Sequence, residues 1–379
     1  MPSLVGSEMC IRDSFIRDGG KTEIKIVDNG NGISNEQLPL SVKRHATSKL
    51  RDDNLFSIKT LGFRGEALPS IASVSKFQII SKTKDNEIAS ELYIVAGELI
   101  HNRLSNRPTG TTVVVQDIFF ATPARLKFLK SEKYENILIK KTIQKLALAN
   151  TEVEFNLFSE NKNIVTTKPI ENSTKPELLK KRVVDLFGES FKNNLILFEQ
   201  KRENFTFTGL ISLPTFHFSN STNQFFFVNN RAIGDKQLHG AIKAAYRDFL
   251  AHDRFPQVII FIETLYKDID VNVHPTKNEV RFKDSNFLRS SLISSIRATL
   301  SMAGHRATTT NSIRALESFK VNTKSHQINF QSPLINENEI IDERKGNFDD
   351  SLKNSSIIIS PETKDTNQPL GYAKCQYHE

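Results

Sequence analysis

Alternating apolar and polar residues predict short strands along the first half of the chain. The clearest case is residues 22–27, where Ile24 and Ile26 alternate with Glu23 and Lys25, the period-two pattern of a strand with one buried face. Similar patterns predict strands at 77–82, 91–95 and 111–116, and helical spacing predicts helices at 36–44, 66–74 and 132–149. This mixture indicates a layered α/β sandwich.

The same reading predicts a second domain further along. Its expected strands are 205–212, 224–228, 257–263 and 269–273, and its expected helices are 235–250 and 287–300. We place the boundary between the two domains within 180–205. A chain of 379 residues has room for two such domains and a tail.

The C-terminal part of the chain has a different composition. After residue 304 it becomes polar and rich in Asn, Ser, Asp and Glu, with few aromatic residues. Such a composition buries too little apolar surface to order itself, so we expect residues 305–368 to be a disordered linker. The apolar run 356–360 within it is expected to be a transient or partner-bound segment.

Charge narrows the class of partner. The net charge is +8, but residues 321–379 hold 6 Lys/Arg against 9 Asp/Glu, so the remainder holds 45 against 34 and carries +11. A basic folded region favours a nucleic-acid partner. No run is long enough to span a membrane, and Met1 to Ser14 has no continuous apolar core of the kind that a secretory signal needs. Cys10 and Cys375 are too few for a disulfide framework, so we expect a cytoplasmic protein.

Candidate chemistry begins at the end of the first predicted strand. Asp28 is followed by Asn29-Gly30 and Asn31-Gly32, which would let the backbone adopt positive φ twice and admit a flat ligand. An ionised Asp only accepts hydrogen bonds, which suits an exocyclic amino group such as that of adenine. Taken alone, the motif fits a hairpin turn better.

Two further motifs favour a nucleotide pocket. Residues 62–68 predict a flexible loop that runs into a helix, and Pro69 lies early enough in that helix to be tolerated. The first amides of such a helix can hold phosphate oxygens. Lys49, in the motif 46–49, and Arg64 are candidate phosphate-binding cations. The alternative is that each is an ordinary solvated surface cation.

The motifs together resemble a known family. DNGNGI at 28–33, RHATSK at 44–49, LGFRGEALPSIASVS at 61–75, GTTVVVQDIFFATPARLKFL at 110–129 and DVNVHPTKNEVRF at 270–282 are similar to the N-terminal ATPase region of the MutL DNA mismatch-repair proteins, which are GHKL ATPases. The resemblance covers about Phe15 to Leu300. It implies a GHKL-type layered α/β sandwich at 15–190, a domain like the second domain of ribosomal protein S5 at 191–304, and the start of a dimerisation domain at 369–379.

The resemblance also implies roles for single residues. Asp28 matches the aspartate that binds the adenine amino group, Gly30 and Gly32 the adjacent glycines, and Thr112 the threonine that supports the base. The lid over the phosphates corresponds to Lys49, Gly62, Phe63, Arg64, Gly65 and Glu66, and Lys277 corresponds to a lysine that reaches the terminal phosphate of ATP from the second domain. His274, beside Pro275, is expected to be structural.

One expected motif is missing. The family carries a catalytic Glu as general base, and an Asn four residues later that holds Mg²⁺, on a helix before this strand. Residues 1–14 contain only Glu8 with room for a helical turn after it, and Arg12 stands four residues later and cannot bind a metal. We therefore expect residues 1–14 to be foreign to the natural protein, and the chain to be a fragment truncated at both ends.

A DNA-binding face is predicted on the helix 235–250. Lys236, His239, Lys243 and Arg247 recur every three or four residues, so they share one face that can follow phosphates. The resemblance places Lys236 where the family has a DNA-contacting arginine. An ordinary solvated face is the alternative.

The sequence departs from the family pattern at two positions. Ala121 replaces an asparagine, which removes a side-chain hydrogen bond in a local turn. Asn230 replaces a glycine, and Asn tolerates positive φ.

The sequence thus predicts a MutL-like mismatch-repair ATPase. In this hypothesis ATP binding gates dimerisation of the N-terminal regions, non-specific binding of double-stranded DNA, and signalling from the mismatch-recognition protein MutS to a downstream nuclease or helicase. The full-length protein would be a homodimer. The alternative is a nucleotide-gated DNA-binding scaffold that does not hydrolyse ATP. A topoisomerase or chaperone ATPase is disfavoured by the motif at 270–282.

Overall fold

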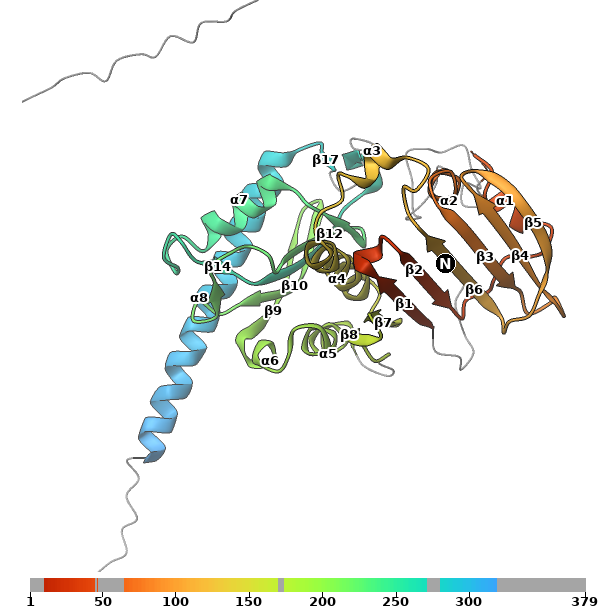
Figure 1. Ribbon diagram of the computed structural model, residues 1–379. Coiled ribbons are helices and arrows are strands. Elements are labelled where there is room, and N and C mark those ends of the chain that lie inside the picture. The colour runs from red at the N-terminus through yellow and green to blue at the C-terminus, as the bar shows by residue number, and fades with distance from the viewer. Residues whose placement is uncertain (1–9, 45, 47–64, 170–173, 271–279, 319–379) are drawn as a thin grey trace, which may run out of the picture. The chain divides into compact units, whose positions relative to one another are not determined.

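The computed structural model describes residues 10–44, 46, 65–169, 174–270 and 280–318, with side chains as far as Ala303. Within these residues the chain forms an eight-stranded sheet followed by a five-stranded sheet, with helices packed on both (Figure 1). A contact-based division keeps residues 1–320 in one compact unit. The sequence-based boundary between two domains therefore stays a prediction.

The eight-stranded sheet has the order β5-β4-β3-β6-β2-β1-β7-β8. Neighbouring strands are antiparallel except β1 and β7, which are parallel. The strands are β1 Ile11–Arg17, β2 Glu23–Asp28, β3 Lys76–Lys82, β4 Ala89–Val95, β5 Glu98–Ser105, β6 Gly110–Gln116, β7 Glu154–Ser159 and β8 Lys162–Thr166. The predicted strands at 22–27, 77–82, 91–95 and 111–116 are thereby confirmed.

Strand β1 was not predicted. It pairs with β2 and β7, and its register sets Arg12 opposite Asp28. Residues 11–14, expected to be foreign sequence, therefore lie inside the sheet, and their origin stays a prediction.

The five-stranded sheet is buried on both faces. Its order is β13-β12-β15-β10-β9, and β12 runs parallel to β15. Along β12, Phe226 and Val228 pack into one apolar cluster while Phe225 and Phe227 pack into another, because successive side chains point to opposite faces. The strands are β9 Leu195–Arg202, β10 Phe205–Ser212, β12 Gln224–Val228, β13 Arg231–Ile233 and β15 Val258–Glu263.

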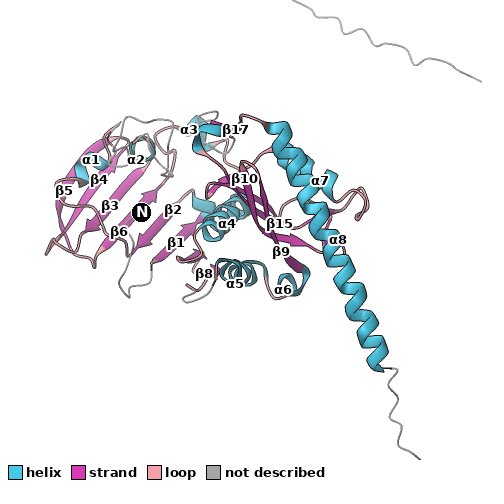
Figure 2. Ribbon diagram, turned by 180° about the vertical axis from the view of Figure 1, so that it is seen from behind, coloured by secondary structure: helices cyan, strands magenta, loops and turns pink. Residues whose placement is uncertain are grey.

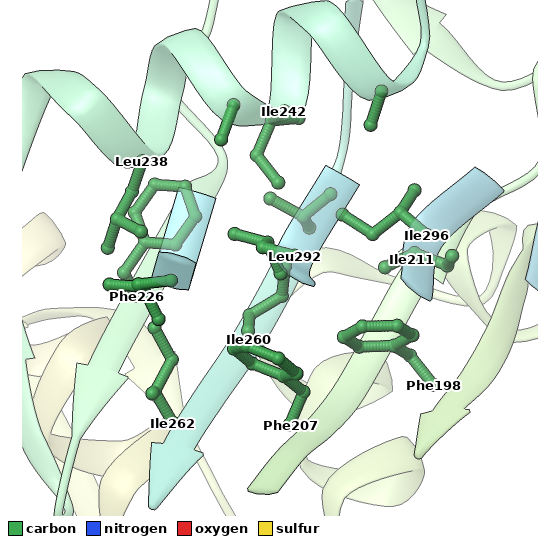
Figure 3. Close-up of a cluster of buried hydrophobic side chains, with 14 of the residues drawn as sticks. Phe198, Phe207, Ile211, Phe226, Leu238, Ile242, Ile260, Ile262, Leu292 and Ile296 are labelled. Atoms are coloured by element: carbon green, nitrogen blue, oxygen red, sulfur yellow. The ribbon is translucent and has the colours of Figure 1, made fainter. Parts of the chain in front are cut away.

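Helices α7 and α8 cover one face of this sheet and lie side by side in Figures 1 and 2. Figure 3 shows Leu238 and Ile242 of α7 and Leu292 and Ile296 of α8 above the strand residues Phe198, Phe207, Phe226, Ile260 and Ile262. The opposite face packs on side chains of α4, α5 and β7. The two sheets therefore share an apolar cluster.

The helix predicted at 132–149 is confirmed, whereas the other predicted helices differ in length from the sequence expectation. They are α1 Leu38–Ser41, α2 Ala67–Ala72, α3 Pro123–Leu126, α4 Glu132–Ala149, α5 Lys175–Phe187, α6 Ser190–Asn194, α7 Lys236–Ala245 and α8 Ser285–Ser318. The helix predicted at 235–250 ends at Ala245. Helix α8 runs on to Ser318, so disorder was wrongly expected for 305–318, where polar composition does not prevent helix formation.

Four shorter strands form two separate two-stranded sheets. β11 His217–Phe218 pairs with β14 Phe255–Pro256, and β16 Ile269–Asp270 pairs with β17 Arg281–Phe282. The strand predicted at 269–273 is confirmed only for its first two residues. The rest of it lies outside the described residues.

A buried arginine joins α5 to the end of the eight-stranded sheet. Arg182 is fully buried, and burial lowers its pKa. Its guanidinium donates to Thr167 Oγ1 at 2.6 Å and to the carbonyl oxygens of Thr151 and Val153 at 2.5 and 2.9 Å. These groups flank β7 and β8, so one side chain satisfies the backbone at both ends of that hairpin.

Replacing Arg182 tests this junction. Arg182→Leu leaves buried carbonyl groups without donors, so we expect the free energy of unfolding in urea to fall by about 2–4 kcal/mol. The matched change Lys180→Leu, at an exposed position of the same helix, should stay within about 0.5 kcal/mol of the wild type. Equal stability of the two variants would contradict a structural role for Arg182.

Candidate functional site

The Asp28 carboxylate is held in place at the end of β2. Its Oδ1 accepts hydrogen bonds from the backbone amide of Gly30 at 2.9 Å and from that of Thr111 at 3.2 Å. Both hydrogen bonds that the described residues donate to this carboxylate are therefore accepted by Oδ1. Oδ2 receives no hydrogen bond from the described residues.

Two glycines allow the backbone to close around this strand end. Gly32 has φ of 74°, and a Cβ there would lie 2.0 Å from the carbonyl oxygen of Lys82. Gly110 has φ of 126°, and a Cβ there would lie 2.2 Å from the carbonyl oxygen of Asp28. Neither position tolerates a side chain.

Gly30 departs from the sequence expectation. Positive φ was predicted at both Gly30 and Gly32, but among the described residues only Gly32 of this pair adopts it. A Cβ at Gly30 would lie 3.0 Å from Asp28 Oδ1, which is close to the carboxylate. Glycine at this position therefore leaves space beside the carboxylate instead of serving a left-handed turn.

Sequence reasoning missed three residues that fix this strand end. Ser81, fully buried on β3, accepts from the amide of Ile33 at 2.7 Å and donates to the carbonyl of Gly110 at 3.0 Å. Arg107 donates to the carbonyl oxygen of Asp28 at 3.0 Å. Burial lowers the pKa of Arg107, and the Asp28 charge opposes that shift. Neither residue belongs to a motif, so only the three-dimensional contact reveals it.

Thr111 is the third residue that fixes this strand end. Strand pairing sets Thr111 opposite Asp28 and Thr112 opposite Val27. Since neighbouring side chains on a strand face opposite sides of the sheet, Thr111 shares a face with Asp28 and Thr112 does not. The role assigned to Thr112 stays a prediction, and Thr111 supplies the observed contact.

A backbone contact and a shared apolar cluster link parts of the three motifs. Gly65 has φ of 62°, and a Cβ there would lie 2.3 Å from the carbonyl oxygen of Ala46, so the second and third motifs touch through their backbones. Ile33 of the first motif and Leu68 of the third pack against the same cluster around Phe77. The first and third motifs thus share a core.

The described residues include only part of the predicted site. Lys49, Gly62, Phe63, Arg64, His274 and Lys277 lie outside the described residues. Glu66 is described and forms the N-terminal cap position of α2, a helix of six residues. In the described part of the chain no cluster of three or more His, Cys, Asp or Glu residues is placed to hold a metal ion.

The basic face of α7 is partly as predicted. Lys236, Lys243 and Arg247 are exposed, and Asp235 caps the helix by accepting from the amides of Gln237 and Leu238. His239 does not join them, because its Nδ1 lies 2.7 Å from Gln224 Oε1 and its ring packs edge-on against Phe226. Burial, followed by the positive charge of Lys141, lowers the His239 pKa.

The two departures from the family pattern have different outcomes. Asn230 has φ of 64°, which confirms that it occupies a position suited to glycine. Beside Ala121, the Thr122 hydroxyl is buried with no hydrogen-bond partner among the described residues. The loss of a side-chain hydrogen bond at Ala121 stays a prediction.

Comparisons with known proteins agree on one family. A family profile described as the C-terminal domain of DNA mismatch repair protein matches residues 183–301. DNA mismatch repair protein MutL of Bartonella bacilliformis is 39% identical over 96% of this chain and 63% of its own length. MutL of Rickettsia bellii is 41% identical over 81% of this chain and 50% of its own. The chain thus spans between half and two thirds of these relatives.

Solved structures show the same likeness. The N-terminal domain of a DNA repair protein superposes with a TM-score of 0.64 at 26% identity, over 78% of this chain and 89% of that one. The Aquifex aeolicus MutL ATPase domain complexed with ADP gives 0.51 at 28% identity, over 67% and 84%. The fold is therefore that of the GHKL ATPases, as predicted.

Sequence and structure comparisons together identify the family. The chain belongs to the MutL family of DNA mismatch-repair proteins. No helix in the described ranges is both long and apolar enough to cross a membrane.

Gly110→Ala tests the close approach at the site. The added Cβ would meet the Asp28 carbonyl and force a left-handed backbone, so we expect a loss of about 2–4 kcal/mol in the free energy of urea unfolding. Gly240→Ala is the matched control, since a Cβ there meets nothing within 4 Å and the helix should gain about 0.5–1 kcal/mol. A stable Gly110→Ala protein would show that the strands are not so tightly apposed.

Proposed function

We propose that the Asp28 site binds an adenine nucleotide, and that this chain is the nucleotide- and DNA-binding region of a mismatch-repair protein. The observation that carries the proposal is the carboxylate held through Oδ1 by two backbone amides. An acceptor fixed in this way is suited to an exocyclic amino group. The ADP complex of the Aquifex aeolicus relative supports the same ligand class.

The rest of the pocket follows from the family resemblance. Lys49, Arg64 and Gly65 would belong to a lid over the phosphates, and Lys277 would reach the terminal phosphate from the second half of the chain. Such a contact exists only when ATP is bound, so ATP binding would change how the two halves are arranged. Mg²⁺ would accompany ATP in the intact protein, and the cell compartment would be the bacterial cytoplasm, with nucleoid association during repair.

The DNA contact would lie on α7. Lys236 and Lys243 are exposed cations on α7, and Arg247 is exposed just beyond its end; such residues hold phosphates without reading sequence. Dimerisation around double-stranded DNA, contact with MutS and signalling to a nuclease or helicase are proposed for the full-length protein.

The alternative is a scaffold that binds nucleotide without hydrolysing it. Arg12, four residues after Glu8, lies in strand β1 opposite Asp28, so it does not occupy the helical position at which the family holds Mg²⁺. A steady-state ATPase assay beside a nucleotide-binding titration separates the two hypotheses. Binding without turnover supports the scaffold, and turnover supports the ATPase.

Asp28→Asn tests nucleotide binding. The amide presents a donor as well as an acceptor and removes the charge, so we expect ADP affinity, measured by isothermal titration, to fall at least about tenfold. Asp85→Asn is the matched control at an exposed carboxylate and should bind ADP as the wild type does. Unchanged affinity in Asp28→Asn would remove this residue from the nucleotide site.

Lys236→Glu tests the DNA contact. Loss of one phosphate contact should weaken binding to duplex DNA most at low salt and lower the slope of log affinity against log salt by about 1. Lys180→Glu, on α5, makes the same charge change elsewhere on the surface and serves as the control. Equal weakening of DNA binding by the two variants would contradict a specific contact between α7 and DNA.

A further inference from the structure

A cavity of about 220 Å³ lies beyond the last turn of α7, next to strand β14. Its lining includes four basic residues, Lys243, Arg247, His252 and Arg254, together with the aromatic ring of Phe255. No Asp or Glu lines it. We propose that this cavity binds a phosphate monoester, such as the 5′-phosphate at the end of a nucleic-acid strand.

The cations at the cavity have little competition from carboxylates. Among the described residues, neither Lys243 nor Arg247 forms an ion pair. Arg254 lies 3.5 Å from Asp253, but both side chains are exposed, and such a contact contributes little. Asp248, the nearest other carboxylate in the sequence, is 3.0 Å from Arg297. These cations are therefore available to an anion.

The end of α7 does not oppose an anion strongly. The carboxyl end of a helix carries partial negative charge on its unpaired carbonyl groups. Here the carbonyl of Ile242 accepts from the amide of Tyr246, that of Tyr246 accepts from the amide of Leu250, and that of Ala244 accepts from Arg297. Three of these carbonyl groups are thus already hydrogen-bonded.

The chemistry of the lining favours a phosphate on a nucleotide. Lys243 Nζ lies 6.0 Å from the centre of the half-buried Phe255 ring, so a cation and an aromatic face stand together. Proteins that hold unpaired nucleotides combine these two elements. A cavity of this size is below the roughly 300 Å³ of whole-ligand pockets, which suits a phosphate and part of a nucleotide. A phosphate monoester carries up to two charges, whereas a carboxylate carries one.

This inference rests on the proposed DNA contact of α7 for its partner class and is independent of nucleotide binding at Asp28. The experiment uses the full chain without ATP. Fluorescence anisotropy compares duplexes with a single-stranded 5′ overhang that ends in either a phosphate or a hydroxyl. We expect the phosphate end to bind about fivefold more tightly, because charged hydrogen bonds add to the backbone contacts.

The variants separate the cavity from the rest of the surface. Arg247→Gln with Arg254→Gln should abolish the difference between phosphate and hydroxyl ends. Lys236→Gln, on α7 and outside the cavity lining, should weaken binding of both duplexes equally and keep the difference. Equal binding of both ends by the wild type, or an unchanged difference in the double variant, would overturn the proposal.

Further arms identify the source of the phosphate. If cytidine 5′-monophosphate competes for the site and cytidine does not, the site also binds free nucleotides. If the difference in affinity between the two duplexes persists in the presence of cytidine 5′-monophosphate, the site binds the phosphate at a strand end. Stronger competition by polyglutamate than by the nucleotide would overturn the proposal in favour of an acidic peptide. Loss of the difference in Asp28→Asn would place the phosphate at the nucleotide site and overturn it as well.

Discussion

The candidate site depends on the close approach of two backbone segments at the end of β2. Gly110 begins the neighbouring strand so near the Asp28 carbonyl that no Cβ fits between them. This approach brings the Thr111 amide to the Asp28 carboxylate, while Arg107 holds the carbonyl of the same residue. The position of one acceptor oxygen is therefore fixed by the main chain, which is less free to move than a side chain.

The same site is linked to the rest of the molecule by shared cores. Ile24 of β2 packs against both the cluster under α1 and α2 and the cluster between the two sheets. The latter cluster includes one face of β12, and the other face of β12 packs under α7, where the basic residues lie. A continuous series of packed side chains thus connects the candidate nucleotide site to the helix proposed to contact DNA.

Much of the fold was predictable because its strands alternate cleanly or are bounded by turn residues, as in β2 and β10. Strand β1 was missed because its sequence has few apolar residues and its place is set by partners on both sides. The extent of α8 was missed because composition argued for disorder. At the site, Asp28 and Gly32 were visible in a motif. Ser81 and Arg107 instead act through contacts with residues 27 or more positions away in the sequence, which no local pattern records.

The central claim is that the Asp28 carboxylate, fixed by the main chain through Oδ1, accepts a hydrogen bond from the adenine amino group through Oδ2. The most direct test compares the affinities of the wild-type chain for ADP and inosine 5′-diphosphate, which carries a carbonyl oxygen in place of that amino group. A carboxylate facing a carbonyl oxygen cannot form the hydrogen bond, so the account predicts that ADP binds at least about tenfold more tightly. Equal affinity for the two nucleotides would contradict it.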